Sequence, residues 1–255
     1  MAFMPFITAG DPDLGVTCEL IELLADCGVD LIEIGFPYSD PIADGPVIQS
    51  SYTRALAKKL AVSAIFEAIG GLTRRRSDLP PLVAMVSYAI IFRIGAAAFV
   101  AQAKASGFSG LIVPDLPADE AAEMARLASG AGLDLVELIA PTTTKERTAK
   151  ILETSRGFLY CISVAGTTGA RTDLPPELRD QLAWLKSQTK LPLAVGFGVS
   201  RPEQVPGLKG VADGVIVGSA IVRHVGRITD EACPKNQALA AIRDLVVQMV
   251  KAVRS

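Results

Sequence analysis

The stretch "LIEIGFPYSDPIADGPVIQS", Leu31 to Ser50, contains the pattern that decides the fold. Its first five residues are apolar apart from Glu33, and they predict a short buried strand. A loop rich in proline, glycine and aspartate follows, and Val47–Lys58 then has the pattern of a helix. A strand, a loop and a helix in this order are typical of a parallel sheet, because a crossover helix must connect each strand to the next.

The same alternation of strand and helix continues along the whole chain and gives eight units. The predicted strands are Phe3–Thr8, Leu31–Gly35, Leu82–Val86, Gly110–Val113, Leu135–Ala140, Phe158–Val164, Leu193–Val195 and Gly214–Val217. Most are continuous apolar runs, as expected for parallel strands buried on both faces. Eight units in 255 residues predict an α/β fold, a single (β/α)8 TIM barrel domain over residues 1–255. A doubly wound sheet is the alternative, but it usually has fewer strands, and no GxGxxG fingerprint opens the first helix.

The composition argues against several classes of function. The chain is 50% hydrophobic with a formal net charge of −2, so it lacks the basic footprint of a nucleic-acid-binding protein and the polybasic patch of a membrane-surface protein. No apolar stretch reaches the roughly 20 residues that a membrane span needs. Its four cysteines are scattered and it has one histidine, so we expect no metal site and a cytoplasmic protein.

Two glycine-containing turns follow the predicted seventh and eighth strands. They are Gly196-Phe197-Gly198 and Gly218-Ser219-Ala220. TIM barrels often bind phosphate between these two loops and the N-terminus of a short helix. Glycine lets the backbone approach the anion, and exposed N–H groups with the helix dipole stabilise it. The turns therefore predict a phosphate site to which Ser219 adds a hydroxyl, although turn glycines without a ligand are the alternative.

Two carboxylates in the opening stretch are candidates for chemistry. Glu33 lies in a buried strand, where an unpaired carboxylate is costly and its pKa rises. Such a group can give and take a proton near neutral pH; the alternative is a structural ion pair with an arginine or lysine. Asp44 lies in the following loop and could reach over the barrel mouth, although aspartate before glycine is also a common turn residue. Tyr160, on the predicted sixth strand, would need a hydrogen-bond partner if buried, and Asp44 is one candidate.

These residues occur together in motifs that resemble one family, the tryptophan synthase alpha chains. The resemblance spans nearly the whole chain. In order, the motifs are "PFITAGDP" (Pro5–Pro12), "EIGFPYSDPIADGPVIQ" (Glu33–Gln49), "GLIVPDLP" (Gly110–Pro117), "APTT" (Ala140–Thr143), "GTTGAR" (Gly166–Arg171), "VGFGVS" (Val195–Ser200) and "ADGVIVGSAIV" (Ala212–Val222). The second motif is the most specific of them.

The resemblance implies a lyase that cleaves indole-3-glycerol phosphate to indole and glyceraldehyde 3-phosphate, a retro-aldol step of tryptophan biosynthesis that uses no cofactor. It implies that Glu33 is the catalytic acid–base and that Asp44 holds the indole N–H. Tyr160 and Thr168 match the residues that orient Asp44. The remaining positions that match substrate-binding residues are Phe6, Phe197 and Ile216 for the indole pocket, and Gly169, Gly198, Gly218 and Ser219 for the phosphate.

The resemblance also implies a partner, the tryptophan synthase beta subunit, in an alpha2-beta2 assembly. The segments Pro37–Asp44 and Val164–Arg171 are expected on the rim that faces this partner and to close over the substrate. Three alternatives stay open: a lyase that releases indole without a partner, a subunit that mainly activates the beta subunit, and an isomerase that shares only the phosphate site. The isomerase would not need the Asp-Pro-x-Ala-Asp-Gly-Pro loop.

The chain departs from the family pattern at three places. Ala89-Ile90 stand where many members have Asn-Pro, and Val164 stands where some have arginine. The chain also starts directly at its first predicted strand, whereas members usually have an extra N-terminal helix that covers the barrel bottom. We therefore expect some apolar strand ends to be exposed.

Overall fold

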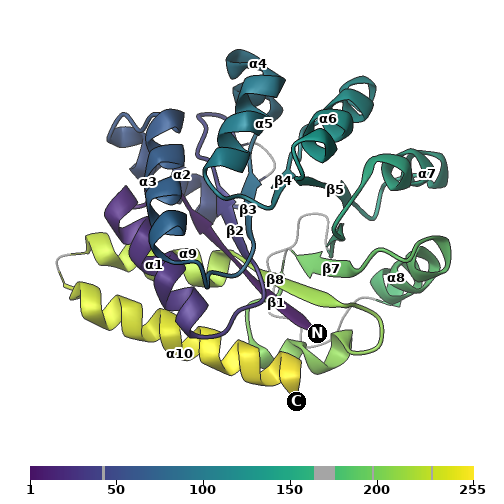
Figure 1. Cartoon of the computed structure of the whole chain (residues 1–255). Helices are drawn as coiled ribbons and strands as arrows, with labels where there is room; N and C mark the ends of the chain where they lie inside the picture. The colour runs from purple at the N-terminus through teal and green to yellow at the C-terminus, as the bar shows by residue number, and fades with distance from the viewer. Residues whose placement is uncertain (42–43, 164–175, 197, 231) are drawn as a thin grey trace.

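The structure is a computed structural model, and it describes residues 1–41, 44–163, 176–196, 198–230 and 232–255. Within these residues, eight parallel strands form a closed barrel in which each strand pairs with its neighbours in chain order (Figure 1). The strands are β1 (Ala2–Thr8), β2 (Ile32–Gly35), β3 (Leu82–Met85), β4 (Gly110–Ile112), β5 (Asp134–Ile139), β6 (Leu159–Ile162), β7 (Leu193–Gly196) and β8 (Gly214–Val217). The predicted (β/α)8 barrel is confirmed.

Helices surround the barrel and connect its strands. They are α1 (Leu14–Asp26), α2 (Pro46–Ala57), α3 (Val62–Arg75), α4 (Tyr88–Ile94), α5 (Ala96–Ala105), α6 (Ala118–Gly130), α7 (Lys145–Thr154), α8 (Pro176–Gln188), α9 (Ser219–Gly226) and α10 (Lys235–Arg254). Short 3-10 turns are η1 (Pro202–Gln204), η2 (Pro206–Leu208) and η3 (Arg227–Thr229). No single described helix is long and apolar enough to cross a membrane; α4 and α5 meet that test only as a pair, bent by 100°.

The strands separate two apolar cores. Ile32 and Ile34 of β2 belong to the larger core, which lies between the strands and the helices. The smaller core, which we call the interior cluster, fills the barrel and takes alternate residues of the strands because side chains on a strand alternate between faces. Glu33 lies opposite Phe6 of β1 and Val83 of β3, and both belong to the interior cluster. The register therefore places the Glu33 carboxyl inside the barrel.

The C-terminal helix packs against the first strand. Figure 1 shows α10, in yellow, lying beside β1 and α9, and these elements are in contact. The Met1 amino group donates to the Val253 carbonyl at 3.4 Å, and Arg254 donates to the Gly28 carbonyl at 2.7 Å. Phe3, near the start of β1, is fully buried. Helix α10 thus covers the strand at which the described chain begins.

Candidate active site

Glu33 is a buried carboxyl group in an apolar environment. Its side chain is 1% exposed, and its Oε2 has no hydrogen-bond partner among the described residues. Burial and, to a smaller extent, the nearby Asp44 carboxylate together raise the pKa of Glu33 to about 8. Glu33 is therefore mainly protonated at neutral pH, close to the point at which it can both donate and accept a proton. No ion pair to Glu33 is found in the described part of the chain, so the alternative of a structural pair receives no support.

Two glycines make room for aromatic side chains next to Glu33. A methyl group added at Gly35 would lie 2.5 Å from the Phe6 ring and 3.1 Å from the Tyr52 hydroxyl. A methyl group added at Gly196 would lie 2.4 Å from the Tyr160 hydroxyl. Real Cβ atoms essentially never show contacts as short as those to Phe6 and Tyr160, so glycine at these two positions lets the two rings approach the strand ends. The result is an interior lined by aromatic rings around one carboxyl group.

Asp44 contributes a second carboxyl group from the loop after β2. Burial raises the pKa of Asp44 to about 6, while a hydrogen bond from the Tyr38 hydroxyl lowers it. At neutral pH Asp44 is therefore ionised while Glu33 is protonated. Carboxyl groups whose environments separate their pKa values in this way can act as an acid and as a charge-stabilising anion in one site.

Tyr160 joins these two carboxyl groups from the opposite side of the barrel. It is 4% exposed and belongs to the interior cluster. Burial raises the pKa of the Tyr160 phenol, and the charges of Glu33 and Asp44 raise it further. The structure thus brings Glu33, Asp44 and Tyr160 within range of one another's charges, although they come from β2, its loop and β6.

The apolar and phosphate-binding candidates meet at β1 and β8. Phe6 and Ile216 are both buried in the interior cluster. Gly218 directly precedes α9, and a methyl group added there would lie 3.5 Å from the Phe6 side chain. Ser219 is the first residue of α9. The turn predicted to bind phosphate therefore lies next to a ring predicted to contact indole.

The turn after β7 contributes the other described glycine of the predicted phosphate site. Gly198 has a φ angle of +112°, which favours glycine over other residues. A methyl group added there would lie 3.5 Å from the Ser163 Oγ. The main-chain N–H of Ser163 donates to the Gly196 carbonyl at 3.0 Å, so the ends of β6 and β7 adjoin at this point. Thr168, Gly169 and Phe197 lie outside the described residues, as does the segment Val164–Arg171.

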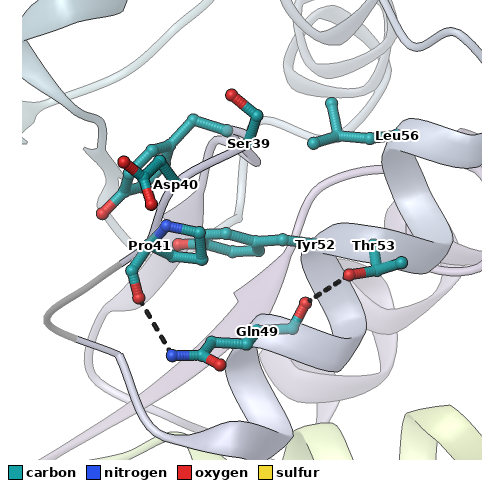
Figure 2. A pocket seen from close by; sticks show the side chains of 8 residues that line it. Ser39, Asp40, Pro41, Gln49, Tyr52, Thr53 and Leu56 are labelled. Atoms are coloured by element: carbon teal, nitrogen blue, oxygen red, sulfur yellow. Dashed lines mark hydrogen bonds between the residues drawn. The ribbon is translucent and has the colours of Figure 1, made fainter.

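A polar pocket of about 460 Å³ lies between the loop after β2 and helix α2 (Figure 2). It is lined by Tyr38, Ser39, Asp40, Pro41, Gln49, Tyr52, Thr53 and Leu56. The rings of Tyr38 and Tyr52 are 5.5 Å apart. The sequence did not indicate Tyr38, Gln49 and Tyr52 as pocket residues, because it does not show which side chains of the loop and of α2 face one another.

Two further carboxylates at this end of the barrel serve structure. Asp11, after β1, is fully buried and forms a bidentate pair with Arg54 of α2 at 2.8 and 2.7 Å. Asp115, after β4, accepts hydrogen bonds from the Ser87 hydroxyl at 2.6 Å and from the Tyr88 N–H at 2.7 Å. It thereby fixes the start of α4. Among the described residues, no group of three or more histidine, cysteine, aspartate or glutamate side chains is placed to hold a metal ion.

Comparisons with known proteins point to one family. The sequence model of the family described as "Tryptophan synthase alpha chain" matches residues 1–254. The tryptophan synthase alpha chain of Rhodopirellula baltica is 48% identical over 232 residues, which cover 91% of this chain and 84% of the relative. That of Carboxydothermus hydrogenoformans is 44% identical over 253 residues, covering 99% and 93%. The crystal structure of the Legionella pneumophila alpha chain superimposes with a TM-score of 0.87 at 35% identity, covering 99% of this chain and 91% of that one.

Proposed function

The chain belongs to the tryptophan synthase alpha chain family, and from this premise we propose which of its residues carry out the reaction. It is a lyase of tryptophan biosynthesis, the alpha subunit that cleaves indole-3-glycerol phosphate. The reaction breaks the bond between the indole ring and the glycerol chain in a retro-aldol step. A proton must reach the ring carbon, and another must leave the glycerol hydroxyl next to it.

Glu33 performs both proton transfers in our proposal. As the neutral acid it protonates the ring carbon that bears the glycerol chain. As the resulting carboxylate it accepts the proton of the adjacent hydroxyl, the carbon–carbon bond breaks, and indole and the aldehyde are formed. The observation that carries this role is the burial of Glu33, without an ion-pair partner in the described chain, inside the barrel. With its pKa near 8, neither protonation state is strongly disfavoured near neutral pH.

Asp44 stabilises the charge that develops on the ring. Protonation of the ring carbon gives the indole nitrogen positive character, and an ionised carboxylate that accepts its N–H stabilises that state more than the ground state. Tyr160 and Thr168 orient Asp44 in this proposal. The location of Tyr160 supports its part, whereas that of Thr168 rests on the sequence motif.

The substrate lies along the barrel mouth with its two ends in different environments. Phe6, Phe197 and Ile216 contact the indole, and Gly169, Gly198, Gly218 and Ser219 bind the phosphate. The burial of Phe6 and Ile216, and the position of Gly218 beside Phe6, support this arrangement. No step of the proposed reaction calls for a cofactor.

Family membership implies a beta-subunit partner in the tryptophan synthase complex. An alpha2-beta2 stoichiometry and a cytoplasmic location are our proposals. The barrel rim formed by the loop after β2 is the surface proposed to face the beta subunit. Rate measurements with and without a cognate beta subunit distinguish an activated subunit from a lyase that acts alone.

The proposed role of Glu33 is tested by Glu33→Gln. The amide keeps the shape of the side chain but cannot exchange a proton. The rate of indole release should therefore fall by about 10²–10⁴-fold, the range typical of general acid–base catalysis, or by more. Binding of glycerol phosphate should be unchanged. A variant that keeps more than about a tenth of the wild-type rate would show that another group moves the protons.

A further inference from the structure

The turn that carries Asp44 is tied to helix α2 by the side chain of Gln49. The Gln49 amide donates to the Asp44 carbonyl at 2.7 Å and to the Pro41 carbonyl at 3.2 Å. The Asp44 N–H donates to the same Pro41 carbonyl at 3.2 Å. Figure 2 shows the Gln49 side chain reaching from the helix to Pro41. Both described ends of the turn are thus fixed to the first turns of α2.

The start of α2 offers little else to hold the turn. Its N-cap is Gly45, which makes no side-chain capping bond, and its first residue is Pro46, which has no N–H. Among the described residues, Gln49 is the one whose side chain hydrogen bonds to both ends of the turn. The exposed Gln49 amide therefore links the turn to the helix by donating to two loop carbonyls.

The carboxyl group of Asp44 faces a different set of contacts. It accepts a hydrogen bond from Tyr38, and the Tyr38 ring packs against Tyr52 at 5.5 Å. The backbone of Asp44 is thus held by Gln49 while its side chain meets Tyr38. A misplacement of about 1 Å in a reacting group can cost about 10²-fold in rate, so the backbone anchor bears on catalysis.

We propose that Gln49 is a positioning residue for the lyase reaction: by holding the carbonyls of Pro41 and Asp44, it places the Asp44 carboxylate where the indole N–H binds. The inference rests on the proposed role of Asp44. Gln49 itself touches neither the ring nor the phosphate in this scheme, so its effect must pass through Asp44.

The test is a double-mutant cycle on the full chain, measured without a beta subunit so that partner affinity does not enter. The variants are Gln49→Met, which keeps the length but loses the donor, Asp44→Asn, and the two combined. Gln49→Glu is a second variant that keeps the shape and replaces the donor by an acceptor. Thr53→Val is the matched control, because Thr53 lines the same pocket but its hydroxyl donates to the main-chain carbonyl of Gln49, at 3.0 Å, and not to either described end of the turn.

The expected result is a fall in kcat of about tenfold for Gln49→Met, the worth of one or two net hydrogen bonds, and at least as large a fall for Gln49→Glu. Inhibition by glycerol 3-phosphate should be unchanged, and Thr53→Val should match wild type. In the Asp44→Asn background, Gln49→Met should lower kcat no further, because the group that it positions is already lost.

Three results would overturn the inference, and they can be told apart. Wild-type kcat for Gln49→Met, together with a slow Asp44→Asn, would leave the function intact and remove the positioning role. An equal loss from Gln49→Met in both backgrounds would show a general effect on the fold. Wild-type kcat for Asp44→Asn would overturn the proposed role of Asp44 and the inference with it.

Discussion

Replacing Glu33 by glutamine should change how the stability of the protein depends on pH. Burial raises the pKa of Glu33 to about 8 from its ordinary value of 4.5. Between these values the folded protein holds a proton on Glu33 that the unfolded chain has released. The free energy of unfolding of the wild type therefore falls as the pH rises through this window, and the contribution is fully present only below the lower value.

The size of the effect follows from the shift. For one proton, each pH unit inside the window lowers the free energy of unfolding of the wild type by about 1.4 kcal/mol. The interval from about pH 6 to about pH 8 therefore lowers it by at most about 3 kcal/mol. Asp44, whose pKa is also raised to about 6, titrates around the lower end of this interval. Glu33→Gln has no proton to lose, and other groups contribute equally to both proteins. The difference in the free energy of unfolding between variant and wild type should therefore change by about 2 kcal/mol, and by no more than about 3 kcal/mol, in favour of the variant over this interval.

The assay is urea unfolding at several pH values, followed by the fluorescence of Trp184, the one tryptophan of the chain. Only the slope against pH of the difference in the free energy of unfolding between variant and wild type is used. The amide also changes local hydrogen bonding, but this adds the same free energy at every pH. Glu153→Gln, at an exposed position on α7, is the control and should give a flat difference. If the difference in the free energy of unfolding between Glu33→Gln and wild type also did not vary with pH, Glu33 would already be ionised in the folded protein at pH 6. Its role as an acid would then be refuted.

Three further predictions concern the rest of the site. Asp44→Asn should mainly lower kcat, whereas Gly218→Asp, which puts a like charge at the proposed phosphate site at a cost of about several kcal/mol, should mainly raise KM and abolish inhibition by glycerol phosphate. Steady-state kinetics that showed the same effect for both variants would contradict this prediction. Arg54→Met should destabilise the protein by about 3–5 kcal/mol because it leaves Asp11 buried without its partner, and adding Asp11→Asn should recover much of the loss in thermal unfolding; no recovery would mean that packing of Arg54 dominates. Addition of a cognate beta subunit should raise the rate of indole release, which stopped or continuous indole assays can measure; complex formation without a rate change would leave a lyase that acts alone.

The barrel could be predicted because its signal is local. Each strand is a short apolar run, and the alternation of side chains on β2 placed Glu33 on the opposite face from Ile32 and Ile34. The glycines beside Phe6 and Tyr160 are also visible in the sequence as interruptions at strand ends. What these glycines accommodate is not visible, because the rings come from other strands.

Other elements depend on contacts between residues distant in sequence, which a local pattern does not show. After β7 the chain forms two 3-10 turns rather than a continuous helix, because Pro202 and Pro206 each lack an N–H. The start of α4 depends on such a contact, because Asp115, which accepts hydrogen bonds from Ser87 and Tyr88, follows a different strand. The roles of Tyr38 and Gln49 likewise depend on how α2 meets the loop before it.

The two carboxyl groups of the site have different pKa values because the fold places them differently. Glu33 is on a strand, where the register forces its side chain into an apolar interior and keeps it protonated. Asp44 is on a loop, where it is less buried and the Tyr38 hydroxyl stabilises its ionised form. The charge of Asp44 also helps to keep Glu33 protonated before the reaction. Positive charge that develops on the indole ring next to Asp44 would offset this effect and favour the Glu33 carboxylate, which is the form that must next accept the hydroxyl proton. In the proposed mechanism, the Asp44 carboxylate that accepts the indole N–H thereby also adjusts the pKa of Glu33, and through this coupling the position of Asp44, and of the side chains that hold it, should affect the rate.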